Sequence, residues 1–281
     1  MKNLLVFYKP EGKITAAAKK IYNFLKRKGY TVKLTKDRVA VKNKSLKGVD
    51  LLISVGGDGT MLRAARVASQ HDIPVFGVNM GRFGFLSEVK PDAALKVLPK
   101  VLCGNYKLDE RMMIQATVFR GSRKIGQTFA LNDVVITKAG IARLIRFNVY
   151  VDDMLVRTHN ADGIIISTPT GSTAYNISVG GPIVYPTTPT FIISPICPHS
   201  MSDRPIVLSA RRDQELVRVT VNIDKSPGKL GAVLLTADGQ QVIKLKEKDK
   251  IVFTEAPMRT KFIRLKEYDF FKVLRSKLKW D

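Results

Sequence analysis

The sequence predicts an α/β domain joined to an all-β domain, with a C-terminal helix that packs back on the first. Up to residue 104, apolar runs typical of strands alternate with amphipathic stretches of helical period, and this order indicates a parallel, Rossmann-like sheet. From Lys107 onward the pattern changes to short alternating runs, spaced as in a β-sandwich. An apolar set partly at helical spacing closes the chain.

Strands and helices are expected to alternate in the first domain. Ala17, Ile21 and Leu25 share one face of an amphipathic helix, which Gly29 stops. Another helix is expected to begin with Thr60 as its N-cap. The expected strands are 3–8, 30–35, 51–55 and 74–79, and the expected helices are 14–28, 60–70 and 91–103.

The β-rich half is placed between a short hinge near residues 104–107 and residue 256. This gives a first domain at 1–104, a β domain at 105–256 and a returning segment at 257–281. The expected strands of the β domain are 115–119, 146–151, 163–167, 191–193, 206–208, 216–223, 232–235 and 251–254. The final helix is indicated by Tyr268, Phe270, Phe271, Val273, Leu274 and Leu278.

Composition narrows the class of protein and of partner. The 281 residues carry a formal charge of +23, so anionic partners are expected: nucleotides, polyphosphate or nucleic acid. No zinc-finger, RRM or aromatic-interleaved basic run is present, so a nucleic-acid module is not expected. No apolar run reaches the roughly 20 residues of a membrane span, and a cytoplasmic protein is expected. Cys103 and Cys197 are too few for a disulfide framework and are expected to be reduced, partly buried thiols.

A glycine turn encloses a carboxylate directly after the apolar run 51–55. The turn reads Gly56-Gly57-Asp58-Gly59-Thr60. Glycines remove the Cβ atoms that block close approach, and the N–H groups of the turn and following helix can point at an anion. In a parallel sheet this turn and residues 79–85 both lie beyond the carboxyl ends of strands, where ligands bind. The alternative is a tight βα turn with a solvated aspartate.

A second polar constellation follows the strand at 163–167. Asp162 precedes that strand, and the run from Thr168 to Ser178 after it is dense in hydroxyls and glycines. Such a run supplies neutral donors and acceptors around a polar ligand, and Tyr175 can stack on or bond to a base or sugar. A capped helix N-terminus is the alternative. The two glycine-rich sites together favour a bound nucleotide.

These segments together resemble the NAD kinases over nearly the whole chain. The quoted pieces are Gly56 to Thr60, Asn132-Asp133, Asp162, Thr168 to Ser178, Pro198-His199-Ser200, Arg204-Pro205 and Asp238-Gly239-Gln240. The glycine turn alone also fits lipid kinases and 6-phosphofructokinases, whereas the Thr-Pro-Thr-Gly-Ser-Thr-Ala-Tyr run is far more specific. The resemblance implies phosphorylation of the adenosine ribose 2′-hydroxyl of NAD to give NADP. It also implies a homo-oligomer, a dimer or tetramer.

Site residues carry over from the resemblance. Asp58 is expected to act as general base, as ligand of a divalent cation, or as both, and Mg²⁺ is the expected cation. Phosphate-donor binding is assigned to Gly56, Gly57, Gly59, Thr60 and Arg63. NAD binding is assigned to Asp58, Gly59, Phe85, Asn132, Asp133, Arg143, Asp162, Thr173, Ala174, Tyr175, Asn176, Ile177, Ser178 and Gln240.

Several alternatives stay open at this point. Asp133 replaces the family's glutamate with a shorter carboxylate, Arg63 and Arg143 are also consistent with surface arginines, and Phe83 or Phe85 with core residues. His199 is read as a structural, hydrogen-bonding residue. ATP and polyphosphate are both expected donors, and NAD and NADH differ too far from the reacting hydroxyl to be separated. A lipid kinase and a non-catalytic nucleotide- or nucleic-acid-binding protein are the competing functions.

Overall fold

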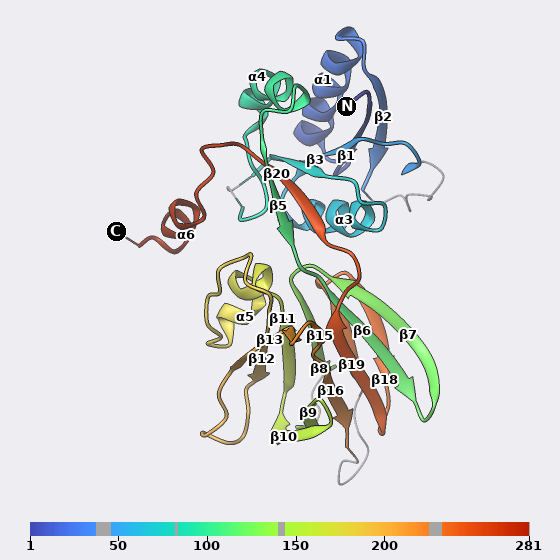
Figure 1. The fold of residues 1–281 in the computed structure, drawn as a ribbon, viewed down its shortest axis with the longest axis vertical. Helices are drawn as coiled ribbons and strands as arrows, with labels where there is room; N and C mark the ends of the chain where they lie inside the picture. The colour runs from blue at the N-terminus through green and yellow to red at the C-terminus, as the bar shows by residue number, and fades with distance from the viewer. Residues whose placement is uncertain (38–45, 82–83, 140–143, 225–231, 281) are drawn as a thin grey trace. The chain divides into compact units, whose positions relative to one another are not determined.

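The computed structural model describes residues 1–37, 46–81, 84–139, 144–224 and 232–280 (Figure 1). The chain forms two compact units. Met1–Glu110 and Met258–Asp281 make up the first, and Arg111–Pro257 makes up the second. The first boundary therefore lies after the expected hinge at 104–107, because the strand that follows the hinge belongs to the sheet of the first unit.

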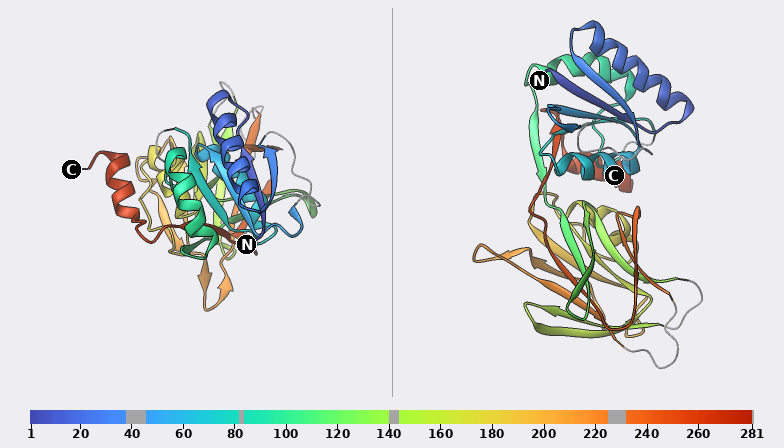
Figure 2. Two further views of the ribbon diagram at one scale, coloured as in Figure 1. Left: turned by 90° about the horizontal axis from the view of Figure 1, so that it is seen from above. Right: turned by 90° about the vertical axis from the view of Figure 1, so that its right-hand side faces the viewer.

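The first unit is a six-stranded sheet with helices on both faces, as Figure 1 and the right-hand view of Figure 2 show. Its strand order is β2-β1-β3-β4-β20-β5, and β2, β1, β3, β4 and β20 run parallel. Helices α1 and α4 lie on one face and α3 on the other. The elements are β1 (Asn3–Tyr8), α1 (Gly12–Arg27), β2 (Thr31–Lys36), β3 (Leu51–Gly56), α3 (Asp58–Ser69), β4 (Val75–Asn79), α4 (Pro91–Leu102), β5 (Lys107–Arg111), β20 (Thr260–Arg264) and α6 (Phe270–Leu278).

The central strands of this sheet are buried along their whole length. All residues of β3 and β4 are buried, as expected for apolar strands covered on both faces. The register pairs Gly56 with Asn79, so the carboxyl ends of β3 and β4 lie side by side. The glycine turn after β3 and the segment after β4 therefore leave the sheet at one edge.

The start of α3 differs from the prediction. The N-cap is Gly57, and Thr60 lies in the first turn instead of capping the helix. The hydroxyl of Thr60 donates to Asp37 Oδ2 at 3.2 Å. A Cβ on Gly56 would lie 2.5 Å from Thr60 Oγ1, so the glycine makes room for this side chain.

The second unit is a sandwich of two six-stranded antiparallel sheets, seen in the right-hand view of Figure 2. One sheet has the order β10-β9-β16-β19-β6-β7 and the other β13-β12-β11-β8-β17-β18. The elements are β6 (Ile114–Arg120), β7 (Arg123–Ala130), β8 (Asp133–Lys138), β9 (Ile145–Val151), β10 (Met154–Ala161), β11 (Gly163–Ser167), η1 (Thr170–Thr173), α5 (Tyr175–Ser178), β12 (Thr190–Ile196), β13 (Ile206–Ser209), β14 (Arg211–Arg212), β15 (Glu215–Leu216), β16 (Val219–Ile223), β17 (Val233–Ala237), β18 (Gln241–Leu245) and β19 (Asp249–Glu255).

Alternating side chains of the two sheets fill the core between them. Phe147, Ile164, Phe191, Val221 and Phe253, from five different strands, are all almost completely buried in one cluster. This is the sandwich packing that the alternating runs predicted.

Two further expectations were wrong. The strand expected at 216–223 is two strands, because the N–H of Arg218 between them donates to Asp152 at 2.9 Å and β15 pairs with β14 in a small hairpin. Both cysteines, Cys103 and Cys197, are exposed. Each follows the end of an element, Leu102 of α4 and Ile196 of β12, and neither points into a core.

Helices of the described residues are all too short or too polar to cross a membrane. Within the same residues, no group of three or more His, Cys, Asp and Glu side chains is arranged to hold a metal ion.

Candidate active site

Asp58 is the first residue of α3 and lies at the carboxyl edge of the first unit's sheet. Its Oδ2 accepts a hydrogen bond from the N–H of Phe85 at 3.3 Å. Its Oδ1 is buried and has no hydrogen-bond partner among the residues that the structure describes. One carboxylate oxygen is thus held by the protein, and the other is buried beside Gly84 without a partner among the described residues, which calls for an explanation.

Gly84 is the residue that lets the carboxylate sit there. A Cβ at this position would lie 1.8 Å from Asp58 Oδ1. Real Cβ atoms do not approach so closely, so any larger residue at 84 has to displace the carboxylate. The sequence analysis noted this glycine only as part of the segment 81–85.

The environment of Asp58 makes it a better proton acceptor near neutral pH. Burial raises the pKa of this carboxyl group, and the charges of Lys277 and Arg264 and the N–H groups of Phe85 and Leu86 oppose the rise. A carboxylate whose pKa lies above its ordinary value is closer to the range in which general bases operate.

The glycines on either side of Asp58 leave open space in front of the helix N-terminus. Among the described residues, no atom outside the adjoining chain and the helix backbone lies within 4 Å of where a Cβ would stand at Gly57 or Gly59. Backbone N–H groups at such a terminus attract anions. This geometry fits the expected contact with donor phosphates.

Arg63 and Thr60 have a shared partner that the sequence analysis missed. The buried Asp37, just after β2, accepts from Arg63 Nη2 at 2.6 Å and from Thr60 Oγ1 at 3.2 Å. A phosphate that binds Arg63 therefore has to compete with Asp37 for the guanidinium. Its place after a strand, at the same edge of the sheet as the glycine turn, is the signal that could have identified Asp37.

Four of the expected NAD-binding residues line one pocket of the second unit. The pocket has a volume of about 370 Å³ and is lined by Asn132, Asp133, Ala174 and Tyr175 together with Val135, Thr137, Thr236, Asp238 and Gly239. Tyr175 is 45% exposed, so its ring is available to a ligand. An amide, a carboxylate and an aromatic ring around one cavity suit a nucleoside.

Asp238 builds the turn that carries Asn132 and Asp133. Its carboxylate accepts from the N–H groups of Leu131 at 3.1 Å, Asn132 at 2.8 Å and Asp133 at 3.4 Å. The sequence analysis quoted Asp238 but assigned a role only to Gln240. Three backbone donors on one carboxylate fix the turn more strongly than a single side-chain contact does.

The pKa of Asp133 lies near neutral pH in this pocket. Burial, and then the negative charge of Asp238, raise the pKa of Asp133 to about 7. At neutral pH this group exchanges between a hydrogen-bond donor and an acceptor-only form.

The hydroxyl-rich run packs around the same turn. The carbonyl of Asn132 accepts from the N–H of Thr168 at 2.8 Å and from Ser167 Oγ at 3.2 Å. A Cβ on Gly171 would lie 2.1 Å from that carbonyl oxygen. Part of the run is therefore structural, although it does not cap a helix: neither η1 nor α5 has a side-chain hydrogen bond at its N-cap.

The side chain of Asn176 bonds inside the unit. Its Nδ2 donates to the carbonyls of Ser172 at 3.3 Å and Pro182 at 3.1 Å, and its Oδ1 accepts from Ser194 Oγ at 2.7 Å. These contacts use both donors of the amide and one acceptor position. The side chain supports η1 and α5 beside the pocket.

The other expected NAD-binding residues lie outside the lining of this pocket. Asp162 forms an ion pair with Lys138 at 2.5 Å, and its carbonyl accepts from Thr137, which does line the pocket. Gln240 lies in the turn between β17 and β18. Thr173, Ile177 and Ser178 belong to η1 and α5.

Phe85 lies in the first unit, with its ring centroid 6.4 Å from that of Phe270 in α6. It is partly buried, so packing against Phe270 and contact with a ligand are both compatible with its position. Arg143 and Phe83 lie outside the described residues.

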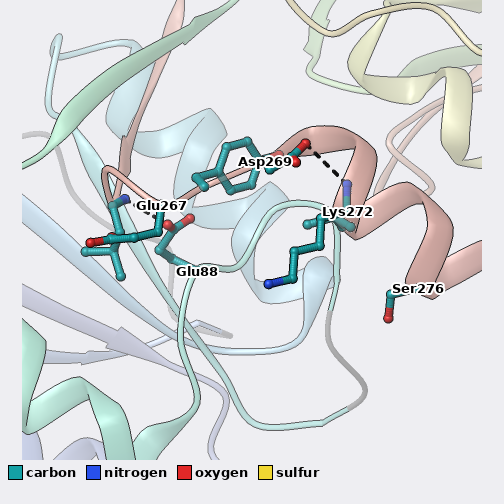
Figure 3. A pocket seen from close by; sticks show the side chains of 8 residues that line it. Glu88, Glu267, Asp269, Lys272 and Ser276 are labelled. Carbon is teal, nitrogen blue, oxygen red and sulfur yellow. Dashed lines mark hydrogen bonds between the residues drawn. The ribbon is translucent and has the colours of Figure 1, made fainter.

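A second pocket, of about 290 Å³, lies beside α6 in the first unit (Figure 3). It is lined by Glu88, Leu265, Glu267, Tyr268, Asp269, Lys272, Val273 and Ser276. Asp269 caps α6 by accepting from the N–H groups of Phe271 and Lys272. None of the site residues expected from the sequence lines this pocket.

An α/β unit with a carboxylate in a glycine turn, followed by a β-sandwich with a nucleoside-sized pocket, defines a two-domain phosphotransferase of the Gly-Gly-Asp-Gly-Thr class. Residues 9–106 match the ATP-NAD kinase N-terminal domain, and residues 131–265 match the ATP-NAD kinase C-terminal domain. The chain belongs to the NAD kinase family.

Relatives and solved structures agree with this assignment. The chain is 38% identical to an NAD kinase of Moorella thermoacetica, with 95% of this chain and 86% of that protein covered. It is 41% identical to an NAD kinase of Trichlorobacter lovleyi, with 90% and 83% covered. The crystal structure of an Archaeoglobus fulgidus NAD kinase in complex with ATP superposes with a TM-score of 0.79 at 26% identity, covering 99% of this chain and 98% of that one.

A yeast NADH kinase complexed with NADH shares the fold, with a TM-score of 0.88 at 23% identity over 100% of this chain and 88% of that one.

Proposed function

We propose that this chain phosphorylates the adenosine ribose 2′-hydroxyl of NAD, with ATP or polyphosphate as donor, and releases NADP. The observation that carries the proposal is the carboxylate of Asp58. It stands in a glycine turn at the N-terminus of α3 with one oxygen bound by the N–H of Phe85 and the other without a partner among the described residues.

In the proposed reaction Asp58 accepts the proton of the 2′-hydroxyl as the hydroxyl oxygen attacks the terminal phosphorus of the donor. The bond between that phosphorus and the bridging oxygen breaks, and ADP or the shortened polyphosphate leaves. The raised pKa of Asp58 supports this role, because a stronger base accepts the proton more readily. The open backbone at Gly57 and Gly59 supports binding of the donor's phosphates. Arg63 is proposed to join them by leaving Asp37 for a phosphate oxygen.

The pocket of the second unit is proposed to bind the adenosine part of NAD. Asn132 and Asp133 can bond to ribose hydroxyls, and the exposed ring of Tyr175 can stack on a base. The remaining carried-over residues, among them Phe85, Asp162, Gln240 and the run 173–178, stay predictions of the same proposal. Asp133 is one methylene shorter than the family's glutamate, so its contact with the ribose hydroxyls is proposed to lie closer to the turn.

A divalent cation, proposed to be Mg²⁺, fits the residues present. The unpartnered oxygen of Asp58 is a hard ligand of the kind Mg²⁺ prefers, and a site with one carboxylate plus substrate phosphates is typical of this ion. Such a cation would neutralise charge that develops on the donor phosphates. Asp58 is the residue that would hold it.

The proposal includes a homo-oligomer, a dimer or tetramer, in the cytoplasm. Both are predictions from the family resemblance and the sequence. Sedimentation of the purified protein measures its oligomeric state.

Product identity tests the proposal. Purified protein is incubated with NAD, Mg²⁺ and either ATP or polyphosphate, and the product is assayed with a dehydrogenase that accepts only NADP. The proposal predicts a product that this dehydrogenase reduces. If the protein is folded and forms no NADP with either donor, the proposal fails, and phosphorylation of a lipid acceptor or ligand binding without turnover takes its place.

A further inference from the structure

We propose that Arg264 is a positioning residue for Asp58, which it reaches through the segment of Phe85 and Leu86, whose two carbonyls it binds and whose Phe85 N–H donates to Asp58. The proposal rests on the proposed role of Asp58 and adds a contribution of the C-terminal segment to it. Arg264 is the last residue of β20, and the sequence analysis did not consider it.

The guanidinium group is buried and its direction is fixed. The Arg264 side chain is 2% exposed. Its Nε donates to Asp109 Oδ2 at 3.0 Å and its Nη1 to Glu88 Oε2 at 3.1 Å. The two carboxylates offset the cost of burying one positive charge and hold the plane of the guanidinium between them.

The remaining donors of the guanidinium bind backbone carbonyls next to Asp58. Nη2 donates to the carbonyl of Phe85 at 3.3 Å and Nη1 to the carbonyl of Leu86 at 3.2 Å. The N–H of Phe85 donates to Asp58 Oδ2 at 3.3 Å. The segment 85–86 therefore lies between a buried cation and the proposed base.

The peptide group between Phe85 and Leu86 connects the two sides. In a trans peptide the C=O and the N–H point in opposite directions. Here the C=O of Phe85 accepts from Arg264, and the N–H of Leu86, on the same peptide, lowers the pKa of Asp58. The hydrogen bond to Asp58 comes from the N–H of Phe85, so the two carbonyls bound by Arg264 fix the segment that carries this donor.

Two aromatic rings pack against the guanidinium group, one from a residue before Arg264 in the sequence and one from a residue after it. Its central carbon lies 4.1 Å from the centroid of the Tyr268 ring and 5.2 Å from that of the Phe262 ring. Glu88, which also accepts from the N–H of Leu265 at 2.8 Å, ties the same segment to the C-terminal chain (Figure 3). A lysine here would keep the charge but lose the planar fork that binds two carbonyls at once.

Arg264 could instead serve only to attach β20 to the sheet. Lys261, in the same strand, provides a matched control because it forms an ion pair with Asp72 at 2.7 Å, before β4, and has no role in the proposed site. A purely structural role of Arg264 would lower the thermal midpoint of its variant without changing kcat, while loss of the more exposed Lys261 pair should change either quantity little.

The test compares Arg264→Lys with Lys261→Gln in the full chain. We measure kcat, KM for NAD and ATP, the thermal midpoint and hydrogen exchange of the segment 84–88. For Arg264→Lys we expect kcat to fall on the order of 10- to 100-fold, since small misplacements of a base have such effects. We expect KM to change by less than about threefold and exchange at 84–88 to accelerate. Lys261→Gln should change neither kcat nor that exchange.

Glu88→Gln is the second variant, for the case in which Arg264→Lys does not fold. It leaves the guanidinium in place but removes one charge that orients it, and we expect a smaller fall in kcat with KM retained. The proposal is overturned if Arg264→Lys, or in its place Glu88→Gln, turns over like the unmodified protein. It is also overturned if kcat falls as far in Lys261→Gln. A wild-type chain that makes no NADP contradicts the proposed function instead, before any variant is compared.

Discussion

Burial raises the pKa values of two carboxyl groups, Asp58 and Asp133, but the charges around the two groups differ. Asp58 faces cationic and N–H groups that oppose the rise, and its buried Oδ1 has no partner among the described residues. Asp133 faces a second aspartate, Asp238, which adds to the rise and brings its pKa to about 7. In the first environment the opposing groups limit the rise in pKa, whereas in the second the proton is lost only near neutral pH.

The raised pKa of Asp133 predicts a stability that falls as the pH rises. Because the folded protein holds this proton more tightly than the unfolded chain, the stabilisation is complete below the ordinary aspartate range and is lost as pH rises through about 7. Asp133→Asn cannot lose a proton, so between pH 5 and 8 its free energy of unfolding should decline less than that of the unmodified protein. The difference should approach about 1.4 kcal/mol for each pH unit in the titrating range.

Urea unfolding of both proteins across this pH range measures the difference. Parallel pH profiles would contradict the assignment of a raised pKa to Asp133.

Residues that are proposed to touch a ligand were easier to predict from the sequence than the residues that hold those side chains in place. Asp58, Asn132 and Tyr175 stand in local patterns, a glycine turn or a polar run, that the sequence displays. Asp37 and Arg264 act on partners at least 23 residues away, and no local pattern indicates such a partner. The same holds for Asp238, which follows β17, whereas its three backbone donors lie where β7 connects to β8.

At the level of the element, the turn at Gly84 predicts an unequal effect of two similar substitutions. Gly84→Ala places a Cβ 1.8 Å from Asp58 Oδ1, whereas nothing lies within 4 Å of the corresponding position at Gly81. We expect Gly84→Ala to reduce kcat on the order of 100-fold or more, because it displaces the base. Gly81→Ala should stay near the unmodified rate. Steady-state kinetics of the two variants measure the difference in kcat. Equal kcat values would contradict the role of Gly84 in placing the Asp58 carboxylate.

The turn held by Asp238 predicts a loss of NAD affinity. Asp238→Ala leaves three backbone N–H groups near the pocket without their acceptor, at a cost of about 1–3 kcal/mol. We expect KM for NAD to rise by at least about tenfold as Asn132 and Asp133 shift.

Asp213→Ala is the matched control, because Asp213 lies in a hairpin turn with φ of 48° and Asp238 in one with φ of 50°. Both substitutions bear the same backbone cost of a positive φ. Steady-state titration with NAD compares them, and a similar KM in the two variants would show that the turn does not serve NAD.

Strands with buried, apolar sequences could be predicted, and strands that complete a sheet from afar could not. The prediction of 3–8 agrees with β1, and 163–167 with β11. β20 is a short strand that enters between β4 and β5, and its partner Val75 lies far back in the chain. Its pairing is a consequence of the tertiary fold, so local periodicity does not reveal it.

At the level of the whole molecule, the charge of +23 predicts salt-sensitive kinetics. A strongly positive protein raises the local concentration of anionic substrates, and salt screens this field, with a Debye length that falls from about 10 Å at 0.1 M to about 3 Å at 1 M. We expect KM for ATP and NAD to rise severalfold over that range while kcat changes less.

Sucrose at matched osmolality controls for effects other than screening and should leave KM unchanged. A KM that does not vary with salt would mean that the positive charges face solvent without serving the substrates. Strong binding of an oligonucleotide in low salt would favour the competing nucleic-acid function.

The division into two units separates two parts of the proposed site. The base and the glycine turn belong to the first unit, which the C-terminal strand β20 completes, and the nucleoside pocket belongs to the second. The fold class followed from the change of sequence pattern near residue 107. The position of the last strand and the exact end of the first unit at Glu110 did not, because both depend on pairing with β20.

The most direct test of the central claim is NADP formation by the unmodified chain and by Asp58→Asn, assayed side by side with NAD, ATP and Mg²⁺, together with NAD binding by calorimetry. The account predicts NADP from the unmodified chain and a loss of kcat of about 100- to 10,000-fold in the variant. NAD affinity should stay within a few-fold. A variant that turns over at the unmodified rate would contradict the account, since its chemistry is assigned to that one carboxylate.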